Sequence, residues 1–481
     1  MKAAQLSLIL SICLIAFSCG AGDNPHNPTI DGFHGIWYAD MVEDSEYGYV
    51  YYSGGMGTYT AKHIPLAYYA PEVNKTFFCY GGTDGKSDGL LQMAAWYDHK
   101  LGVASRPTVV VDKHTEDAHD NAALMLDGDG YVWIFAASHG QARPSQIYRS
   151  EEPYSTAAFK PVYEGNFSYP QPWYIPGRGF LFLHTRYIDG RHLYVMTSPD
   201  GYTWSEPRPL SLIEQGQYQI SWSTGEKVCT AFNMHPDAGA GNWDDPEKAG
   251  ANHTKSGANS RSNLYYMETT DMGETWRTAS GETLAIPIPN RDNPALVHNY
   301  LHEGLLVYVK DMAFDSDGHP VILYVTSRGP ESGPENAPRT WHTAAWDGRE
   351  WRIGEITTSD NNYDMGSLYI GENGEWSVIA PTIDGPQAYN SGGEVALWES
   401  EDRGDTWRTK ALTRVSEYNH SYVRKPVNAD DGFYAFWVDG HGRIPSPSRL
   451  FFYDRRNDRV YRLPEHMKGD TAPPDLMTGE E

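Results

Sequence analysis

Two histidines stand where the chain could hold an acid and a base close together. The polar stretch from Asp112 to Asn121 contains His119, and residues 137–140, which follow a strand-like run, contain His139. His119 and His139 therefore flank a hairpin-like pair of strands, which can bring both to one edge of a sheet. Because histidine titrates near neutral pH, such a pair offers a general acid and a general base. The alternative interpretation is that each is a structural histidine.

A tyrosine and an arginine follow in the next strand-like segments. Tyr169 precedes one such segment, and Arg186 ends the one after it. A tyrosine can relay a proton, and an arginine can hold a carboxylate through two parallel hydrogen bonds. The alternatives are a tyrosine in an aromatic core and an arginine on a solvated rim.

Further polar residues surround a stretch rich in Gly, Asn, Asp and Lys. This stretch, residues 236–261, is expected to form a long surface loop over one face of the molecule. The candidates for substrate binding are Asn121, His235, Arg261 and Asn263.

A metal site has weaker support. Cys229 and His235, with either His253 or His298, could bind zinc, but no tight ligand spacing supports such a site. We therefore expect no required cofactor, with a structural zinc or calcium ion as the alternative. His63 lies apart from the other candidates, and the chain shows no nucleophile elbow, phosphate-binding loop or dinucleotide fingerprint.

A short repeated signature indicates which elements must position these residues. The pattern Ser/Thr-x-Asp-x-Gly-x-Thr-Trp occurs at residues 269–276 and 400–407, and in a form one residue shorter at 198–204. In such a turn the Asp bonds its own backbone, the Gly takes a positive φ, and the Trp packs between sheets. Weaker echoes and a spacing of roughly 65 residues predict about seven such units. We expect an all-β chain folded as a β-propeller, with seven four-stranded blades.

Composition agrees with this fold and excludes some functions. Aromatic residues make up 13% of the 481 residues, and the chain contains 47 Gly and 31 Pro, which is typical of strands joined by many turns. Lys and Arg total 38 against 63 Asp and Glu, a net charge of −25. This charge argues against a nucleic-acid binder or an anionic-membrane binder. An anionic ligand would need a local basic cleft.

The first residues predict export. Lys2 is followed by an apolar run from Leu6 to Phe17 and then by Cys19, which resembles a bacterial lipoprotein signal. We expect a signal peptide at 1–19 with lipidation of Cys19, a polar tether at 20–30, one propeller at 31–465 and a flexible tail at 466–481. Ordinary secretion is the alternative. As a lipoprotein it would lie at the cell surface, at the outer membrane or in the periplasm, and would contact the membrane through its lipid anchor only.

Several longer stretches resemble one group of propeller enzymes, and the resemblance runs from about Gly35 to Pro464. The stretches that carry it are residues 35–38, 52–59, 74–82, 118–121, 131–140, 358–366 and 418–422. They are similar to the BNR-repeat propellers that include the ulvan lyases of polysaccharide lyase families 24 and 25. The same group contains the rhamnosyl-glucuronate hydrolases of glycoside hydrolase family 145.

The resemblance implies a seven-bladed propeller that acts on rhamnose–uronic acid linkages of an anionic polysaccharide. In the lyases two His, a Tyr and an Arg line the central cleft, which His119, His139, Tyr169 and Arg186 would match. The implied reaction is β-elimination at a uronic acid, in which a cationic group neutralises the carboxylate beside the C5 proton. In the hydrolases a single His on the opposite face is catalytic, and His63 is the candidate.

Three other functions remain open at this stage. One is hydrolysis of the rhamnosyl bond through His63. Another is dehydration of an oligosaccharide by the same elimination chemistry. The third is glycan binding by a surface lipoprotein without catalysis.

Overall fold

The computed structural model describes most of the chain after its first 25 residues. The described ranges are 26–42, 50–56, 63–85, 89–188, 190–235, 260–371 and 373–477. The predicted signal peptide, Cys19, His253 and most of the predicted loop at 236–261 lie outside them. Within these ranges, no helix has the length and apolar character needed to cross a membrane.

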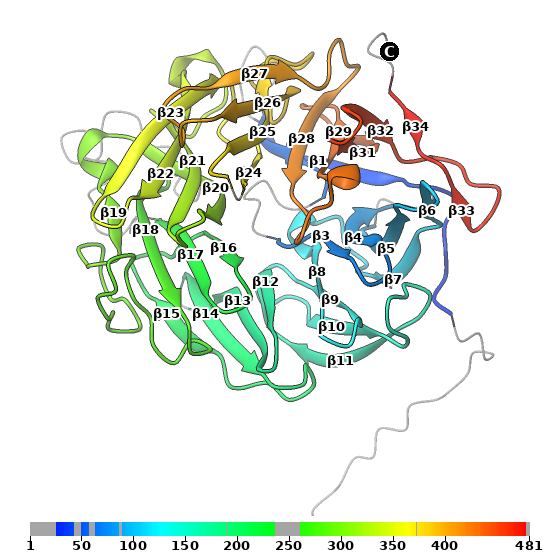
Figure 1. The fold of residues 1–481 in the computed structure, drawn as a ribbon, viewed down its shortest axis with the longest axis horizontal. Helices are drawn as coiled ribbons and strands as arrows, with labels where there is room; N and C mark the ends of the chain where they lie inside the picture. The colour runs from blue at the N-terminus through cyan, green and yellow to red at the C-terminus, as the bar shows by residue number, and fades with distance from the viewer. Residues whose placement is uncertain are drawn as a thin grey trace, which may run out of the picture.

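The described strands form an all-β propeller, which confirms the predicted fold class (Figure 1). Five sheets have four antiparallel strands each, paired in the order of the chain. They consist of β8–β11 (Ala122–Leu126, Val132–Ala136, Ser145–Ser150, Phe159–Gly165), β12–β15 (Ser168–Ile175, Gly179–Tyr187, Arg191–Ser198, Arg208–Ser211), β16–β19 (Gln219–Ser223, Val228–Met234, Ser262–Thr269, Leu296–His298), β20–β23 (Leu306–Phe314, Pro320–Ser327, Arg339–Trp346, Trp351–Ser359) and β24–β27 (Ser367–Ile370, Trp376–Ile383, Glu394–Ser400, Arg408–Ala411).

The remaining two sheets are larger. One repeats the four-strand path with β28 (Asn419–Arg424), β29 (Ala435–Gly440), β31 (Leu450–Asp454) and β32 (Arg459–Arg462), and adds β34 (Asp475–Leu476) at its edge. The other has nine strands: β1–β7 (Gly35–Val42, Val50–Gly54, Ala67–Ala70, Lys75–Gly82, Leu91–Asp98, Val103–Ser105, Thr108–Asp112), β30 (Ser446–Ser448) and β33 (Thr471–Ala472). Six sheets thus follow the expected blade pattern, and the seven-blade count is not confirmed.

Two strands from the C-terminal part of the chain pair with the first sheet. β30 pairs with β1, so that Gly35 lies opposite Ser448, and β33 pairs with β6. The predicted flexible tail at 466–481 is therefore wrong for residues 471–472 and 475–476, because their backbone groups join the edges of two sheets. These pairings close the ring and cover edges that would otherwise be open.

The first strand of each sheet with a blade pattern, together with β3, lies nearest the centre of the ring (Figure 1). These inner strands are buried on both sides, and β8 is buried at each of its five residues. Each of them begins where the chain returns from the rim. Residues just before an inner strand, such as His119 before β8, therefore gather around the centre of one face.

The repeated signatures form the expected turns at the rim. Gly201, Gly273 and Gly404 have φ values of 76°, 78° and 90°. Asp402 Oδ1 accepts a hydrogen bond from the Thr406 amide at 2.8 Å, which is the predicted bond of the Asp to its own backbone. All three turns join the third strand of a sheet to its fourth, so they shape the fold and contribute nothing to the centre.

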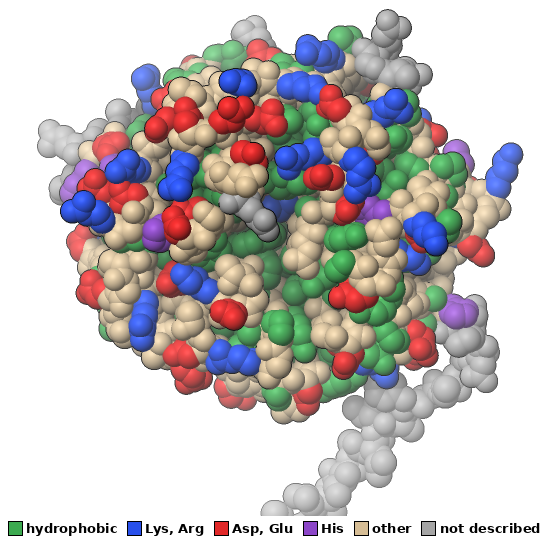
Figure 2. Space-filling view, in the orientation of Figure 1, with side chains coloured by type: hydrophobic (Ala, Val, Ile, Leu, Met, Phe, Trp, Pro, Cys, Tyr) green, Lys and Arg blue, Asp and Glu red, His purple; other side chains and the backbone are tan. Residues whose placement is uncertain are grey.

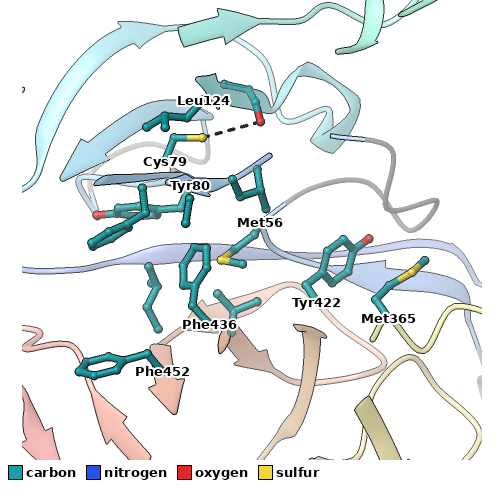
Figure 3. Packing of buried hydrophobic residues seen from close by; sticks show 14 of the residues in the cluster. Met56, Cys79, Tyr80, Leu124, Met365, Tyr422, Phe436 and Phe452 are labelled. Atoms are coloured by element: carbon teal, nitrogen blue, oxygen red, sulfur yellow. Dashed lines mark hydrogen bonds between the residues drawn. The ribbon is translucent and has the colours of Figure 1, made fainter. Parts of the chain in front are cut away.

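The core packs between neighbouring sheets. Figure 3 shows Cys79, Tyr80 and Leu124 on one side of a core cluster and Phe436 and Phe452, from the last sheet, on the other. Cys79 donates a weak hydrogen bond to the Ala122 carbonyl oxygen at 3.9 Å, and Cys229 lies in a different core cluster. Both thiols are free and buried, and burial raises the pKa of each.

Candidate active site

The two predicted histidines stack on each other and share one carboxylate. The rings of His119 and His139 are 3.9 Å apart and nearly parallel, at 11°. His119 Nδ1 lies 2.5 Å from Asp117 Oδ1, and His139 Nδ1 lies 2.8 Å from Asp117 Oδ2. Because a carboxylate only accepts hydrogen bonds, each ring carries a hydrogen on its Nδ1. The Nε2 atom of each ring then points away from Asp117.

Local structure fixes this arrangement. Asp117 caps a single 3-10 turn, Ala118–Asp120, by accepting from the His119 amide, and His139 follows the end of β9. Asp120 accepts from the His139 amide at 2.8 Å and from two nitrogens of Arg143 at 2.8 and 2.9 Å. The turn before β8 and the segment after β9 are thereby held together at the same edge of one sheet.

The shared carboxylate favours the protonated form of His139. Burial lowers the pKa of His139, but the hydrogen bond to Asp117 and its negative charge outweigh that effect and raise the pKa. Burial also raises the pKa of Asp117, and the hydrogen bonds from both histidines lower it far more. His139, whose side chain is 36% exposed, is therefore suited to carry a positive charge toward a ligand.

Three tyrosines form a hydrogen-bonded cluster beside the histidines. Tyr169 Oη lies 2.8 Å from Tyr187 Oη and 3.2 Å from Tyr218 Oη. The ring of Tyr169 is 5.9 Å from that of His119, and the ring of Tyr187 is 5.4 Å from that of His139. Tyr169 is buried and has a φ of 53° at a bulge in β12, while Tyr187 is half-buried.

Two arginines lower the pKa of one member of this tyrosine cluster. Burial raises the pKa of Tyr218, but the charges of Arg191 and Arg261 and a hydrogen bond from Tyr169 lower it to about 6. Arg191 Nη1 donates to Tyr218 Oη at 3.2 Å, and the Arg261 guanidinium lies 4.5 Å from the centre of the Tyr218 ring. The cluster can therefore hold a negative charge near neutral pH.

Strand register separates Arg186 from this cluster. In the pairing of β13 with β14, Tyr187 lies directly opposite Arg191, and Arg186 lies opposite His192. Successive side chains of a strand point to opposite faces. Arg186 therefore points away from Tyr187, and its guanidinium lies 5.5 Å from the ring centre of Tyr194. The structure does not bring Arg186 to the histidines as expected, and Arg191 occupies that position.

The predicted substrate-binding residues are buried and bonded to the protein itself. Asn121 donates to the carbonyl oxygens of Gly55 and Ala118 at 3.1 and 3.2 Å. Asn263 donates to Tyr265 Oη at 3.2 Å and accepts from the Leu301 amide at 2.9 Å. These bonds hold both side chains within the protein, while Asn121 Oδ1 has no hydrogen-bond partner among the described residues.

His235 and Arg261 support the tyrosine cluster from behind. Arg261 Nε donates to His235 Nε2 at 3.1 Å, and the His235 ring stands perpendicular to that of Tyr218 at 4.6 Å. Both residues are almost fully buried, at 0% and 2% exposure. They lie behind Tyr218, and their predicted contact with substrate stays a prediction.

His63 lies beside the predicted pair and not on an opposite face. Its Nε2 is 3.1 Å from the His119 carbonyl oxygen, and its ring is 5.7 Å from that of Tyr169. Burial lowers the pKa of His63 to about 3. His63 is therefore neutral and inside the same cluster, which differs from the separate site expected for a hydrolase.

The predicted metal ligands do not come together. Cys229 lies 3.5 Å from the Met312 sulfur in the core, whereas His298 pairs with Glu303 at 2.5 Å on the outer strand β19. Among the described residues, Asp117, His119 and His139 do place three ligand atoms within 4.8 Å of one another. The same three side chains also pair with one another through hydrogen bonds.

Basic side chains gather at the centre of an acidic protein. Arg261, Lys310 and Arg424 are each at most 3% exposed. Burial lowers the pKa of Lys310, and the nearby carboxylate of Asp364 acts against that shift. On the face drawn in Figure 2, by contrast, acidic and basic side chains are interspersed around the rim. These side chains are too buried to contact a ligand directly, so they can favour an anion only through the charge that Arg261 and Arg424 keep at the centre.

Asp117, Tyr187, Arg191 and Tyr218 were missed by the sequence argument. Asp117 stands two residues before His119 within the polar stretch, so its spacing was a usable signal. Tyr187 and Arg191 could have been found only from the register of β13 and β14. Tyr218 precedes the inner strand β16 just as His119 precedes β8, which is a signal that the blade pattern supplies.

Comparison with known proteins identifies relatives over most of the chain. A model described as a BNR repeat-containing family member matches residues 91–359. A protein of Nonlabens ulvanivorans named ulvan lyase is 22% identical over 354 residues, which cover 67% of this chain and 71% of that protein. An ulvan lyase of Alteromonas sp. (strain LOR) is 23% identical over 384 residues, covering 68% and 73%.

Solved structures show the same fold. A polysaccharide lyase PL25 ulvan lyase superposes with a TM-score of 0.65 at 15% identity, covering 90% of this chain and 96% of that one. The same values hold for that enzyme bound to -[GlcA(1-4)Rha3S]-. The polysaccharide lyase Uly1 gives a TM-score of 0.56 at 11% identity, covering 88% and 98%.

Proposed function

The chain belongs to the BNR repeat-containing family, and from that premise we propose that it is a polysaccharide lyase. Its substrate is an anionic, ulvan-like polysaccharide, and it cleaves rhamnose–uronic acid linkages by β-elimination. The observation that carries the proposal is the stacked pair His119 and His139 on Asp117, placed against the tyrosine cluster and Arg191. The relatives named ulvan lyase, and the sulfated rhamnose–glucuronate bound to one solved structure, support the choice of substrate.

The chemistry requires the charge of the uronate to be neutralised. The C5 proton is a weak acid while the neighbouring carboxylate is charged, because its loss adds a second negative charge. His139 and Arg191 flank Tyr187, which is half-buried, and both can carry a positive charge there. A carboxylate bound between them would delocalise the charge that develops in the transition state.

Tyr187 is the member of the tyrosine cluster that is placed to take the C5 proton. As its oxygen accepts that proton, its own proton moves to Tyr169, and the Tyr169 proton moves to the Tyr218 phenolate. The C5–H and C4–O4 bonds break, and the C4–C5 double bond forms. Tyr187 then gives a proton to the leaving oxygen O4 as the relay runs back through Tyr169, which restores the Tyr218 phenolate. A positioned acid–base group of this kind increases the reaction rate by about 10²–10⁴-fold.

The test is to mix the purified protein with ulvan and with rhamnose–glucuronate oligosaccharides. The ultraviolet absorbance of a C4–C5 unsaturated uronate and the number of reducing ends are followed together. A rise in both is expected. Reducing ends without absorbance would indicate hydrolysis, absorbance without new reducing ends would indicate dehydration, and either result would contradict the proposal.

Matched variants separate catalysis from folding. Tyr169 and Tyr174 lie on the same strand, β12, with Tyr169 at the end of the tyrosine cluster and Tyr174 near the other end. Tyr187→Phe and Tyr169→Phe should lose most of the activity, whereas Tyr174→Phe should keep it. Equal loss in all three would show that the hydroxyl groups serve stability alone.

Two finer features belong to the same proposal. The strands β3, β4, β5 and β6 pair in chain order within the nine-stranded sheet, which supports counting them as a seventh blade. The leader at residues 1–19 supports export as a lipoprotein acylated at Cys19. Mass spectrometry of the amino terminus of the exported protein tests the second feature, and an unmodified Cys19 would contradict it.

A further inference from the structure

A small cavity lies on the face of the ring opposite to the histidine pair. Its walls come mainly from the inner strands β3, β8 and β12 and the segments that follow them, and these strands are neighbours in the ring (Figure 1). His119 stands just before β8, whereas Leu126, which lines the cavity, ends that strand. At about 3.3 Å per residue the two places are about 20 Å apart, so the proposed reaction does not use the cavity.

Three half-buried tyrosines line this cavity. Tyr68 lies on β3, Tyr174 lies on β12, and Tyr154 lies between β10 and β11; we call them the cavity tyrosines. The turn after β8 approaches two of them closely because it has glycine at 128 and 130. A Cβ on Gly130 would lie 2.3 Å from Tyr154 Cζ, and one on Gly128 would lie 3.0 Å from Tyr174 Oη. The backbone of this turn thereby packs against both rings.

The ionised side chains at this cavity are acidic. Glu72 and Asp127 line it, and no lysine or arginine is among its described lining residues. Asp127 accepts hydrogen bonds from two backbone amides and from Trp133 Nε1, which are neutral donors, so these bonds leave its negative charge in place. Burial raises the pKa of Tyr154, and the nearby carboxylates raise it further. An anionic ligand would therefore be repelled here.

No cation of the chain covers the faces of these rings. At other aromatic rings the protein supplies one: the Arg149 guanidinium lies 3.2 Å from the centre of the Tyr131 ring, and Lys425 Nζ lies 3.9 Å from that of Trp222. Within the described part of the chain, no lysine or arginine takes such a place over the cavity tyrosines. The negative faces of aromatic rings attract cations, most strongly where water is excluded. This attraction is therefore left for a ligand.

We propose that this cavity binds a small free organic cation with a quaternary ammonium group, such as choline. A quaternary nitrogen has no hydrogen to donate, so it is held by ring faces and by charge, and the cavity supplies both. The volume of about 200 Å³ is below the about 300–1,000 Å³ of sites for larger ligands, so it suits one such group. The inference goes beyond the proposed function and does not depend on it, because the histidine pair takes no part.

Choline and its uncharged analogue 3,3-dimethyl-1-butanol separate charge from shape. Each is titrated into the purified protein, and binding is followed by ligand-observed NMR at low and at physiological ionic strength. Choline should bind about tenfold more tightly than the alcohol, and the difference should shrink as salt screens the carboxylates. Equal binding of the two, or no binding of choline up to about 10 mM, would overturn the proposal.

Matched variants test the ring and the charge. Tyr154→Leu removes a ring and should weaken choline binding by about tenfold, whereas Tyr154→Phe keeps the ring and should change it by less than about twofold. Glu72 is exposed, so Glu72→Gln should fold normally and weaken binding by about threefold. Glu350→Gln, exposed in the turn between β22 and β23, should leave binding unchanged. Unchanged binding in Glu72→Gln, or an equal loss in Glu350→Gln, would overturn the proposal even if Tyr154→Leu does not fold.

A free cation and a lipid headgroup can carry the same ammonium group, and phosphocholine distinguishes them. Its phosphate would meet the charge of Glu72, so phosphocholine should bind more weakly than choline. Phosphocholine binding as tight as that of choline would overturn the assignment to a free cation.

Discussion

Asp117 holds both histidines, and replacing it by Asn tests the active-site argument most directly. Asn keeps one oxygen acceptor, which can serve His119 or His139 but not both, because its nitrogen is a donor. The substitution also removes the negative charge that raises the pKa of His139. Asp117→Asn should therefore leave one histidine without its partner and reduce the positive charge at the site.

The magnitude follows from the bonds that are lost. A hydrogen bond to a charged group contributes about 1.5–3 kcal/mol. The bond to His139 falls at the lower end, because this side chain is 36% exposed and water screens the pair. A loss of about 1.5 kcal/mol, at about 1.4 kcal/mol per factor of ten, predicts a fall in kcat/KM of about tenfold.

The assay is kcat/KM for unsaturated uronate formation across pH. The reaction needs protonated His139, so activity falls as pH rises through its raised pKa. In Asp117→Asn the pKa of His139 should be lower, because the charge of Asp117 no longer opposes the effect of burial. The loss of activity with rising pH should therefore begin at a lower pH. The stability difference has the same sign. The bond to protonated His139 stabilises the folded state below the unfolded pKa and is lost as pH rises through the folded value.

Asp112→Asn is the matched control. Asp112 pairs with His114 at 3.1 Å, but His114 is 84% exposed, so the same chemistry is present without burial. This variant should change kcat/KM by less than about twofold. The reasoning is refuted if Asp117→Asn keeps its activity within about threefold and its pH profile matches that of the wild type.

Three further predictions test other parts of the structure. Arg191→Met should lower kcat/KM by about 10²-fold or more. Arg186→Met, on the opposite face of the same sheet, should change it less than about twofold. Similar losses in both variants would show that the strand register does not decide which arginine acts at the site. Activity of the wild type should rise as pH rises through the Tyr218 pKa of about 6, and Tyr218→Phe should remove that limb of the pH profile; a rise that persists in the variant assigns it to another group. Lys425→Met removes the partner of Asp311, 3.0 Å away, and leaves the buried carboxylate without a counter-charge. The free energy of unfolding, measured with urea, should fall by about 3–5 kcal/mol. A loss below about 1 kcal/mol would show that other groups stabilise Asp311 without Lys425.

Local patterns of a few residues were predictable from the sequence. The signature at 400–407 forms its turn because Asp402, Gly404 and Thr406 interact within that short segment, whatever lies around it. The same holds for His119, whose place before a strand-like run put it at the inner edge of a sheet. These features depend on the chain's own backbone bonds and on the alternation of apolar residues.

The composition of the site could not be read in this way, because it depends on register and on contacts between sheets. Neighbouring residues of a strand point to opposite faces of the sheet. The bulge in β12 and the register of β13 with β14 therefore bring Tyr187 to the site and turn Arg186 away from it. Tyr218 gains its low pKa because the charges of Arg191, from the neighbouring sheet, and of Arg261, which precedes β18, lie beside it. The sequence by itself determined an all-β repeat with a histidine pair at its inner edge. The tertiary structure decided which charges meet there, since electrostatic effects act through space and not along the chain.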